Sequence, residues 1–218
     1  MITRIKICCI ASIEEALTAI EYGASAIGLV GKMPSGPGPI EDEKIRLIAA
    51  SIPPPIATFL LTSETEPEEI IKHHSRTLTN TIQLVDTLRK GSHEEIRRSL
   101  PSVKLVQVVH VADGKSAEFA IGISDKVDAL LLDSGNPLLK IKELGGTGRT
   151  HDWNISRKIC EKAACPVFLA GGLNPGNVGE AISKVRPFGV DVCSGVRTGG
   201  NLDREKVMAF IASVKKFE

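Results

Sequence analysis

The feature that most constrains the fold of this chain is a regular alternation of short apolar runs with amphipathic segments. The apolar runs are typical of buried strands, and the amphipathic segments, several opened by a Ser or Asp that can cap a helix, are typical of helices. The sequence predicts strands at 4–10, 26–30, 55–61, 81–85, 103–111, 128–133, 166–170 and 190–193. It predicts helices that begin at Ser12, Asp42, Thr65, Ser92, Lys115, Asp152, Asn174 and Asp203.

Strict alternation implies parallel strands joined by crossover helices. About eight such units in 218 residues predict a single α/β domain over residues 1–218, a (β/α)8 TIM barrel. A doubly wound open sheet is the alternative, but no G-x-G-x-x-G follows the first predicted strand. Neither a linker nor a low-complexity segment interrupts the pattern, so we expect no internal domain boundary.

Composition excludes several classes of function. The 27 basic and 26 acidic residues nearly balance, so nucleic acid and membrane surfaces are not expected partners. No apolar run approaches a membrane span, and the N-terminal residues lack a signal-peptide pattern, so we expect a cytoplasmic protein. The five cysteines show neither disulfide-framework nor zinc-site spacing, and we expect no bound metal.

The segment 166–178 predicts an anion site. A short strand is followed by Gly171 and Gly172, where backbone N–H groups can approach a ligand closely, and then by a helix that we expect Asn174 to cap. A second strand end, with Ser194 and Gly195, repeats this arrangement. In a β/α barrel, the loops after the last two strands often bind phosphate. A pair of ordinary strand-to-helix turns is the alternative.

Two residues at predicted strand ends are candidates for acid–base chemistry. Asp133 ends an apolar run, where partial burial would raise its pKa and let it act as a general acid. The alternative is a carboxylate that only hydrogen-bonds the following loop. Cys8 alternates with Lys6 on one face of the first strand, whereas Cys9 is expected on the other face. A lowered pKa would make Cys8 a base or nucleophile, and a buried structural cysteine is the alternative.

The five histidines form no metal-ligand pattern. His73, His74 and His93 fall on predicted helices, whose outer faces we expect to be solvated. His110 lies at a strand end and is the one worth testing, although a hydrogen-bonding role is favoured over a catalytic one.

With these residues in view, the chain resembles the phosphoribosylanthranilate isomerase family of tryptophan biosynthesis over nearly its whole length. Several stretches carry the resemblance in the family's order: KIC at 6–8, IQL at 82–84, LLLDS at 130–134, GGTGRTHDW at 145–153, LAGGLNPGNV at 169–178 and VDVCSGV at 190–196.

The resemblance implies a β/α barrel that carries out an Amadori rearrangement without cofactor or metal. The substrate would be N-(5-phosphoribosyl)anthranilate, a small phosphorylated sugar derivative, and the product a 1-deoxyribulose 5-phosphate. Asp133 would protonate the furanose ring oxygen, and Cys8, as thiolate, would remove the proton from sugar C2. Phosphate would rest on backbone N–H groups. The resemblance suggests these phosphate contacts at Gly148, Gly171, Gly172, Ser194 and Gly195, and further substrate contacts at Lys6, Gln83 and Arg149.

The chain also departs from the family pattern. The loop after the second strand reads SGPGP at 35–39, with no counterpart of the Arg that contacts the anthranilate carboxylate. Cys9 replaces a Gly, Arg197 replaces a Glu, and Val85-Asp86 replaces His-Gly. Two alternatives therefore stay open: a paralogous isomerase for another phosphorylated amino sugar, or a barrel that binds a phosphometabolite without converting it. The family contains monomers and dimers, so we expect a monomer or a homodimer.

Overall fold

The computed structural model describes residues 2–135 and 148–217. Its principal strands are β1 (Arg4–Ile7), β2 (Ala26–Val30), β3 (Ala57–Thr62), β4 (Thr81–Leu84), β5 (Lys104–His110), β6 (Ala129–Asp133), β7 (Val167–Leu169) and β8 (Gly189–Val192). Its helices are α1 (Ile13–Tyr22), α2 (Asp42–Ser51), α3 (Pro67–Thr77), α4 (His93–Ser99), α5 (Gly114–Ile123), α6 (Trp153–Lys162), α7 (Val178–Val185) and α8 (Arg204–Lys215). A short hairpin, β9 (Arg197–Thr198) and β10 (Asn201–Leu202), follows the 3-10 turn η1 (Ser194–Val196).

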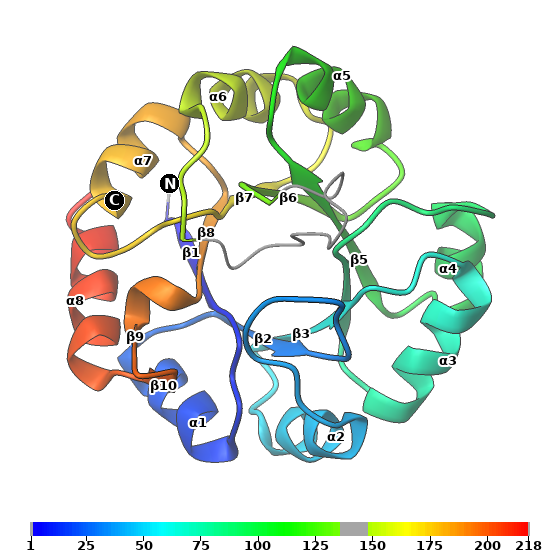
Figure 1. Cartoon of the computed structure of the whole chain (residues 1–218), viewed down its shortest axis with the longest axis horizontal. Coiled ribbons are helices and arrows are strands. Elements are labelled where there is room, and N and C mark those ends of the chain that lie inside the picture. The colour runs from blue at the N-terminus through cyan, green and yellow to red at the C-terminus, as the bar shows by residue number, and fades with distance from the viewer. Residues whose placement is uncertain (1, 136–147, 218) are drawn as a thin grey trace.

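Strands β1 to β8 form a closed parallel barrel in chain order, and the helices surround it as an outer ring (Figure 1). Closure joins the first strand to the last: Arg4 pairs with Gly189, and Lys6 with Asp191. The predicted barrel is therefore confirmed. In this topology the carboxyl ends of all eight strands meet at one face, where barrels carry their functional residues.

Two apolar layers hold the barrel together. The outer layer joins strand residues such as Ile7 and Leu60 to helix residues such as Ala16 and Ile70. The inner layer consists of residues from the strands and strand ends, such as Phe59 and Leu131, and it fills the barrel interior. Because neighbouring residues of a strand face opposite sides, each strand contributes to both layers.

Most predicted boundaries are correct to within a few residues, but two helix starts are wrong. The helix predicted from Asn174 begins at Val178, because Asn174 caps a turn instead, accepting from the Gly176 N–H at 2.9 Å. The helix predicted from Thr65 begins at Pro67 without a side-chain cap. In contrast, Ser12 caps α1 as predicted, with its hydroxyl accepting from the Glu15 N–H at 3.1 Å.

Candidate active site

A cavity opens at the carboxyl ends of the strands and brings together residues from both ends of the chain. Cys8 and Asp133 both line it, together with Gln83, Asp191 and the glycine-rich turns. Its remaining described lining comes from the loop after β2 and from apolar strand-end side chains, namely Cys9, Val30, Met33, Ser35, Gly36, Pro37, Leu61, Val85, Ala170, Leu173, Val192 and Cys193.

Cys8 directly follows β1 and is held there by its N–H, which donates to the Val192 carbonyl at 2.8 Å. Gly28 of β2 leaves room for the sulfur, since a Cβ on Gly28 would lie 2.7 Å from Cys8 Sγ. A hydrogen bond with the Cys9 thiol lowers the pKa of Cys8; burial opposes this effect, and the charge of Lys6 adds to the lowering. The buried thiol is therefore biased towards the thiolate, the form that can act as a base.

Lys6 lies fully buried in the barrel, where its Nζ contacts Asp191 Oδ1 at 2.8 Å and stands 5.2 Å from the centre of the Phe59 ring. Burial by itself would lower the pKa of Lys6, but the Asp191 carboxylate and the Cys8 thiol outweigh burial and raise that pKa. Lys6 therefore stays charged beneath Cys8. Asp191 also lines the cavity, and it was not among the predicted site residues. The sequence signal that marks it is a carboxylate inside an apolar strand, the same signal that marks Asp133.

Asp133 is the last residue of β6 and is buried, with its Oδ1 accepting from the Ser134 N–H at 2.7 Å. Burial raises the pKa of Asp133, and the Ser134 N–H and neighbouring His110 oppose the rise only in part. The carboxyl group therefore holds its proton to higher pH than an exposed aspartate, as a general acid requires. The alternative, a carboxylate that hydrogen-bonds the following loop, is also present. Asp133 therefore combines a raised pKa with a loop contact.

The predicted orientation of Cys9 is wrong. Strand β1 ends at Ile7, and Cys9 has φ 61°, a left-handed conformation that costs a non-glycine residue about 1–2 kcal/mol. Its side chain therefore faces the inner layer with Cys8, where it lies within hydrogen-bonding reach of the Cys8 and Cys193 sulfurs. These hydrogen bonds, together with burial, raise the pKa of the Cys9 thiol.

The predicted anion site is built from three loops packed against one another. Gly171 and Gly172 have φ of 81° and 63°, and a Cβ on Gly172 would lie 2.6 Å from the Arg149 carbonyl carbon. A Cβ on Gly195 would lie 2.1 Å from the Leu173 carbonyl oxygen, closer than any real contact. Packing of the three loops therefore requires glycine at these positions, whether or not a ligand is bound.

The other predicted site residues divide into two groups. Gly148, Gly171, Gly172, Ser194 and Gln83 line the cavity, and the buried Gln83 Oε1 has no hydrogen-bond partner among residues 2–135 and 148–217. Lys6, Gly195 and Arg149 are outside the described lining. Arg149 contributes its backbone instead, because its carbonyl accepts from Ser134 Oγ at 2.6 Å. The start of the GGTGRTHDW motif, residues 145–147, lies outside the described residues.

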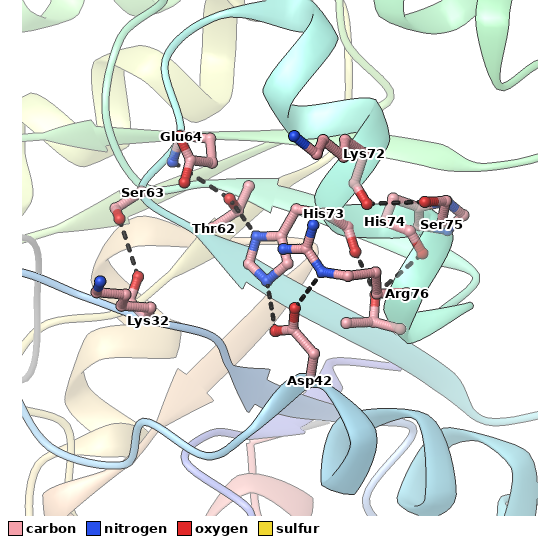
Figure 2. A network of polar contacts seen from close by, with 11 residues as sticks. Lys32, Asp42, Thr62, Ser63, Glu64, Lys72, His73, His74, Ser75 and Arg76 are labelled. Carbon is pink, nitrogen blue, oxygen red and sulfur yellow. Dashed lines mark hydrogen bonds and ion pairs between the residues drawn. The ribbon is translucent and has the colours of Figure 1, made fainter.

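The expectation that His73 and His74 face solvent is also wrong, because both are buried. Figure 2 shows His73 between Thr62 Oγ1, 2.8 Å from its Nδ1, and Asp42 Oδ1, 3.0 Å from its Nε2. His110 lies at the end of β5, where its Nε2 is 3.0 Å from the Val85 carbonyl. This contact is the hydrogen-bonding role that the sequence favours, although the buried Nδ1 of His110 has no partner among the described residues.

Among the described residues, no group of three or more His, Cys, Asp or Glu side chains is arranged to hold a metal ion. Within the same part of the chain, no helix has the length and apolar character needed to cross a membrane.

A family model described as N-(5'phosphoribosyl)anthranilate (PRA) isomerase matches residues 5–213. This chain belongs to that family. A relative from Methanocella arvoryzae, named N-(5'-phosphoribosyl)anthranilate isomerase, is 36% identical over 214 residues, which cover 98% of each chain. The crystal structure of the Thermotoga maritima phosphoribosyl anthranilate isomerase is 32% identical, with a TM-score of 0.82, covering 98% of this chain and 99% of the other.

A further phosphoribosyl anthranilate isomerase crystal structure is a complex with reduced 1-(o-carboxyphenylamino)-1-deoxyribulose 5-phosphate. It is 31% identical to this chain, with a TM-score of 0.79, and the match covers 98% of this chain and 99% of the other. The family resemblance stated from the sequence motifs is therefore confirmed. All four departures from the isomerase family pattern lie at the cavity or next to it. Cys9, Val85 and residues 35–37 line the cavity, and Arg197 donates to the Cys9 carbonyl.

Proposed function

We propose that this chain is a phosphoribosylanthranilate isomerase, which converts N-(5-phosphoribosyl)anthranilate into its 1-deoxyribulose 5-phosphate isomer. The single observation that supports this best is the pairing, in one cavity, of a buried carboxyl group of raised pKa with a buried thiol of lowered pKa. The reaction needs these two groups, an acid that is still protonated and a base that is already ionised, at the same pH.

In the proposed mechanism, Asp133 donates its proton to the furanose ring oxygen. The C1–O bond breaks, the nitrogen lone pair forms a Schiff base to C1, and the ring opens. Burial of Asp133 favours this step because it disfavours the carboxylate in the free enzyme.

The Cys8 thiolate then removes the proton from C2, and the electrons move to the Schiff-base nitrogen to give an enolamine. Tautomerisation of the enolamine then gives the ketone: the C2 hydroxyl loses its proton, which restores the acid form of Asp133, and C1 gains the proton that Cys8 had taken. Lys6 assists from below, since its charge lowers the pKa of Cys8 without lining the cavity itself.

The phosphate group would rest on the turns after β7 and β8, on N–H groups of Gly171, Gly172, Ser194 and Gly195, with Gly148 closing the site. Gln83 would accept a hydrogen bond from the sugar or the aglycone amine, since its buried Oε1 has no partner in the part of the chain that the structure describes. Lys6 supports the site through Asp191, and Arg149 supports it through its backbone. The proposal includes a cytoplasmic location, one domain, and a monomer or homodimer.

The test is a fluorescence assay with N-(5-phosphoribosyl)anthranilate generated in place. We expect turnover by the wild type, and a loss of about 10²–10⁴-fold in kcat for Asp133→Asn and for Cys8→Ala, the usual contribution of a positioned acid or base. Phosphate binding by both variants provides the control for folding. Equal turnover by wild type and both variants would contradict the assignment.

A second candidate keeps the reaction but changes the aglycone. It is favoured by one observation: the cavity-lining residues in the described part of the chain include no Lys, Arg or His that could pair with an anthranilate carboxylate. A folded wild type that binds inorganic phosphate but does not turn over N-(5-phosphoribosyl)anthranilate would support this candidate, and a screen of phosphorylated amino sugars would follow. Phosphate binding with no conversion in that screen would favour the non-catalytic barrel.

A further inference from the structure

The loop at residues 31–41, named here the pocket loop, brings side chains from outside the barrel to the cavity. Met33, Ser35, Gly36 and Pro37 all line the cavity from this loop. If the proposed function is correct, the loop contacts the part of the substrate that distinguishes one amino sugar from another, because the phosphate seat lies on other loops.

Both ends of the pocket loop are fixed by polar contacts. At its start, Ser63 Oγ donates to the Lys32 carbonyl at 2.9 Å (Figure 2). At its end, Asp42 contacts both His73, 3.0 Å away, and Arg76. The first contact fixes the loop to the segment after β3, and the second joins the start of α2, which follows the loop, to α3; neither reaches the middle of the loop.

The middle of the pocket loop is supported by Cys9. The Cys9 sulfur lies 3.6 Å from the Pro37 carbonyl oxygen, within donating distance, and the single thiol proton is shared between this carbonyl and the Cys8 sulfur. Gly38 packs directly on the same side chain, since a Cβ on Gly38 would lie 2.7 Å from the Cβ of Cys9. The left-handed backbone at Cys9 is what points this side chain towards the loop.

Arg197 holds Cys9 in that conformation. The Arg197 guanidinium, on β9, donates to the Cys9 carbonyl and to the Gly200 carbonyl. It is itself fixed by Glu15, 3.1 Å away, whose carboxylate also accepts from the Ala11 N–H at 2.9 Å. The guanidinium is mostly buried, so this contact is largely shielded from water.

We propose that Cys9 and Arg197 act together as positioning residues that fix the pocket loop over the substrate. Three of the four departures from the family pattern, at Cys9, Arg197 and 35–39, then form one physical unit: Arg197 contacts Cys9, and Cys9 contacts the loop. This inference rests on the proposed function for its substrate, but the placement of the loop can be measured without substrate.

The experiment compares Cys9→Gly, Cys9→Ser and Arg197→Met with wild type in two measurements. In hydrogen exchange on the free protein, we expect the amides of Ser35, Gly36 and Gly38 to exchange at least about tenfold faster in Cys9→Gly and Arg197→Met. In steady-state kinetics, we expect Arg197→Met to raise KM by about fivefold or more with kcat within about twofold, the pattern of lost ground-state binding. In Cys9→Gly we expect the same rise in KM together with a fall in kcat, because the Cys9 thiol also lowers the pKa of Cys8. Cys9→Ser keeps a donor for the Pro37 carbonyl, so its loop exchange and its KM should stay close to the wild-type values.

Cys165→Ser is the matched control, because Cys165 is a half-buried thiol outside the cavity lining. Unchanged exchange at Ser35, Gly36 and Gly38 in both Cys9→Gly and Arg197→Met would overturn the proposal, whatever the kinetics show. If wild type shows no turnover, the proposed function fails while the exchange result still decides the loop. If Cys9→Gly does not fold, Arg197→Met provides the same test, because it removes the contact that holds the Cys9 backbone.

Discussion

Lys6 and Asp191 form an ion pair of 2.8 Å across the seam where the first barrel strand meets the last. The pair has two consequences. It ties β1 to β8 inside the barrel, and it holds a positive charge beneath the Cys8 thiol.

The first prediction concerns the stability that this pair provides. Lys6→Met leaves the buried Asp191 carboxylate without its partner, and we expect a loss of about 3–5 kcal/mol in the free energy of unfolding, measured by urea denaturation. Lys72→Met is the control, because the ion pair of Lys72 with Glu69 is exposed and long, at 3.8 Å. Its loss should change the free energy of unfolding by less than about 1 kcal/mol. Similar losses in the two variants would show that the buried pair has no special role.

The second prediction concerns the ionisation of Cys8. Because the Lys6 charge helps to lower the pKa of Cys8, we expect Lys6→Met to raise that pKa, so that the thiolate forms at higher pH. The measurement is the ultraviolet absorbance of the thiolate against pH, with Cys8→Ala subtracted to isolate the signal. An unchanged titration in Lys6→Met would contradict the electrostatic account of the base.

The third prediction concerns the packing of the anion site. Gly195→Ala places a Cβ against the Leu173 carbonyl, so the loops after β7 and β8 must move apart, and we expect phosphate affinity to fall at least about tenfold by calorimetry. Gly122→Ala is the matched control, because Gly122 lies on α5 and a Cβ added there would have no atom of the described residues within 4 Å. The control should bind phosphate normally and gain about 0.5–1 kcal/mol of stability.

The fourth prediction concerns acid stability. Burial lowers the pKa of His151 from 6.5 to about 4, and its Nε2 lies 2.7 Å from Ser156 Oγ. The unfolded chain therefore binds a proton below pH 6.5 that the folded chain does not bind until about pH 4. Wild type should lose about 3 kcal/mol across this window from this group. The free energy of unfolding, measured by urea denaturation between pH 6.5 and pH 4, should fall correspondingly less in His151→Gln. If the free energy of unfolding falls equally with pH in wild type and in His151→Gln, His151 is excluded as the cause.

The fold was largely predictable because it depends on local patterns. Each strand is a short apolar run, and caps such as Ser12 mark helix starts where the side chain has no competing use. Asn174 shows the limit of this reasoning: the same side chain can cap a helix or a turn, and only the path of the chain after β7 decides between them.

The candidate site was predictable where a strand ends in a residue of unusual chemistry. Asp133 and Cys8 were found in this way and do share a cavity, although their catalytic roles stay predictions. The orientation of Cys9 was not predictable, because the strand stops early and Arg197, far away in the sequence, holds the backbone. The burial of His73 likewise depends on Asp42 from another helix.

Closure of the barrel through β1 and β8 also affects how the molecule is made. Strand β1 leaves the ribosome early but cannot pair with β8 until about 185 further residues have been synthesised, the separation of Lys6 and Asp191. Until then, a lysine destined for the interior has no partner, and the open edge of β1 can pair with other chains. Nascent chains should therefore depend most on chaperones just before β8 emerges.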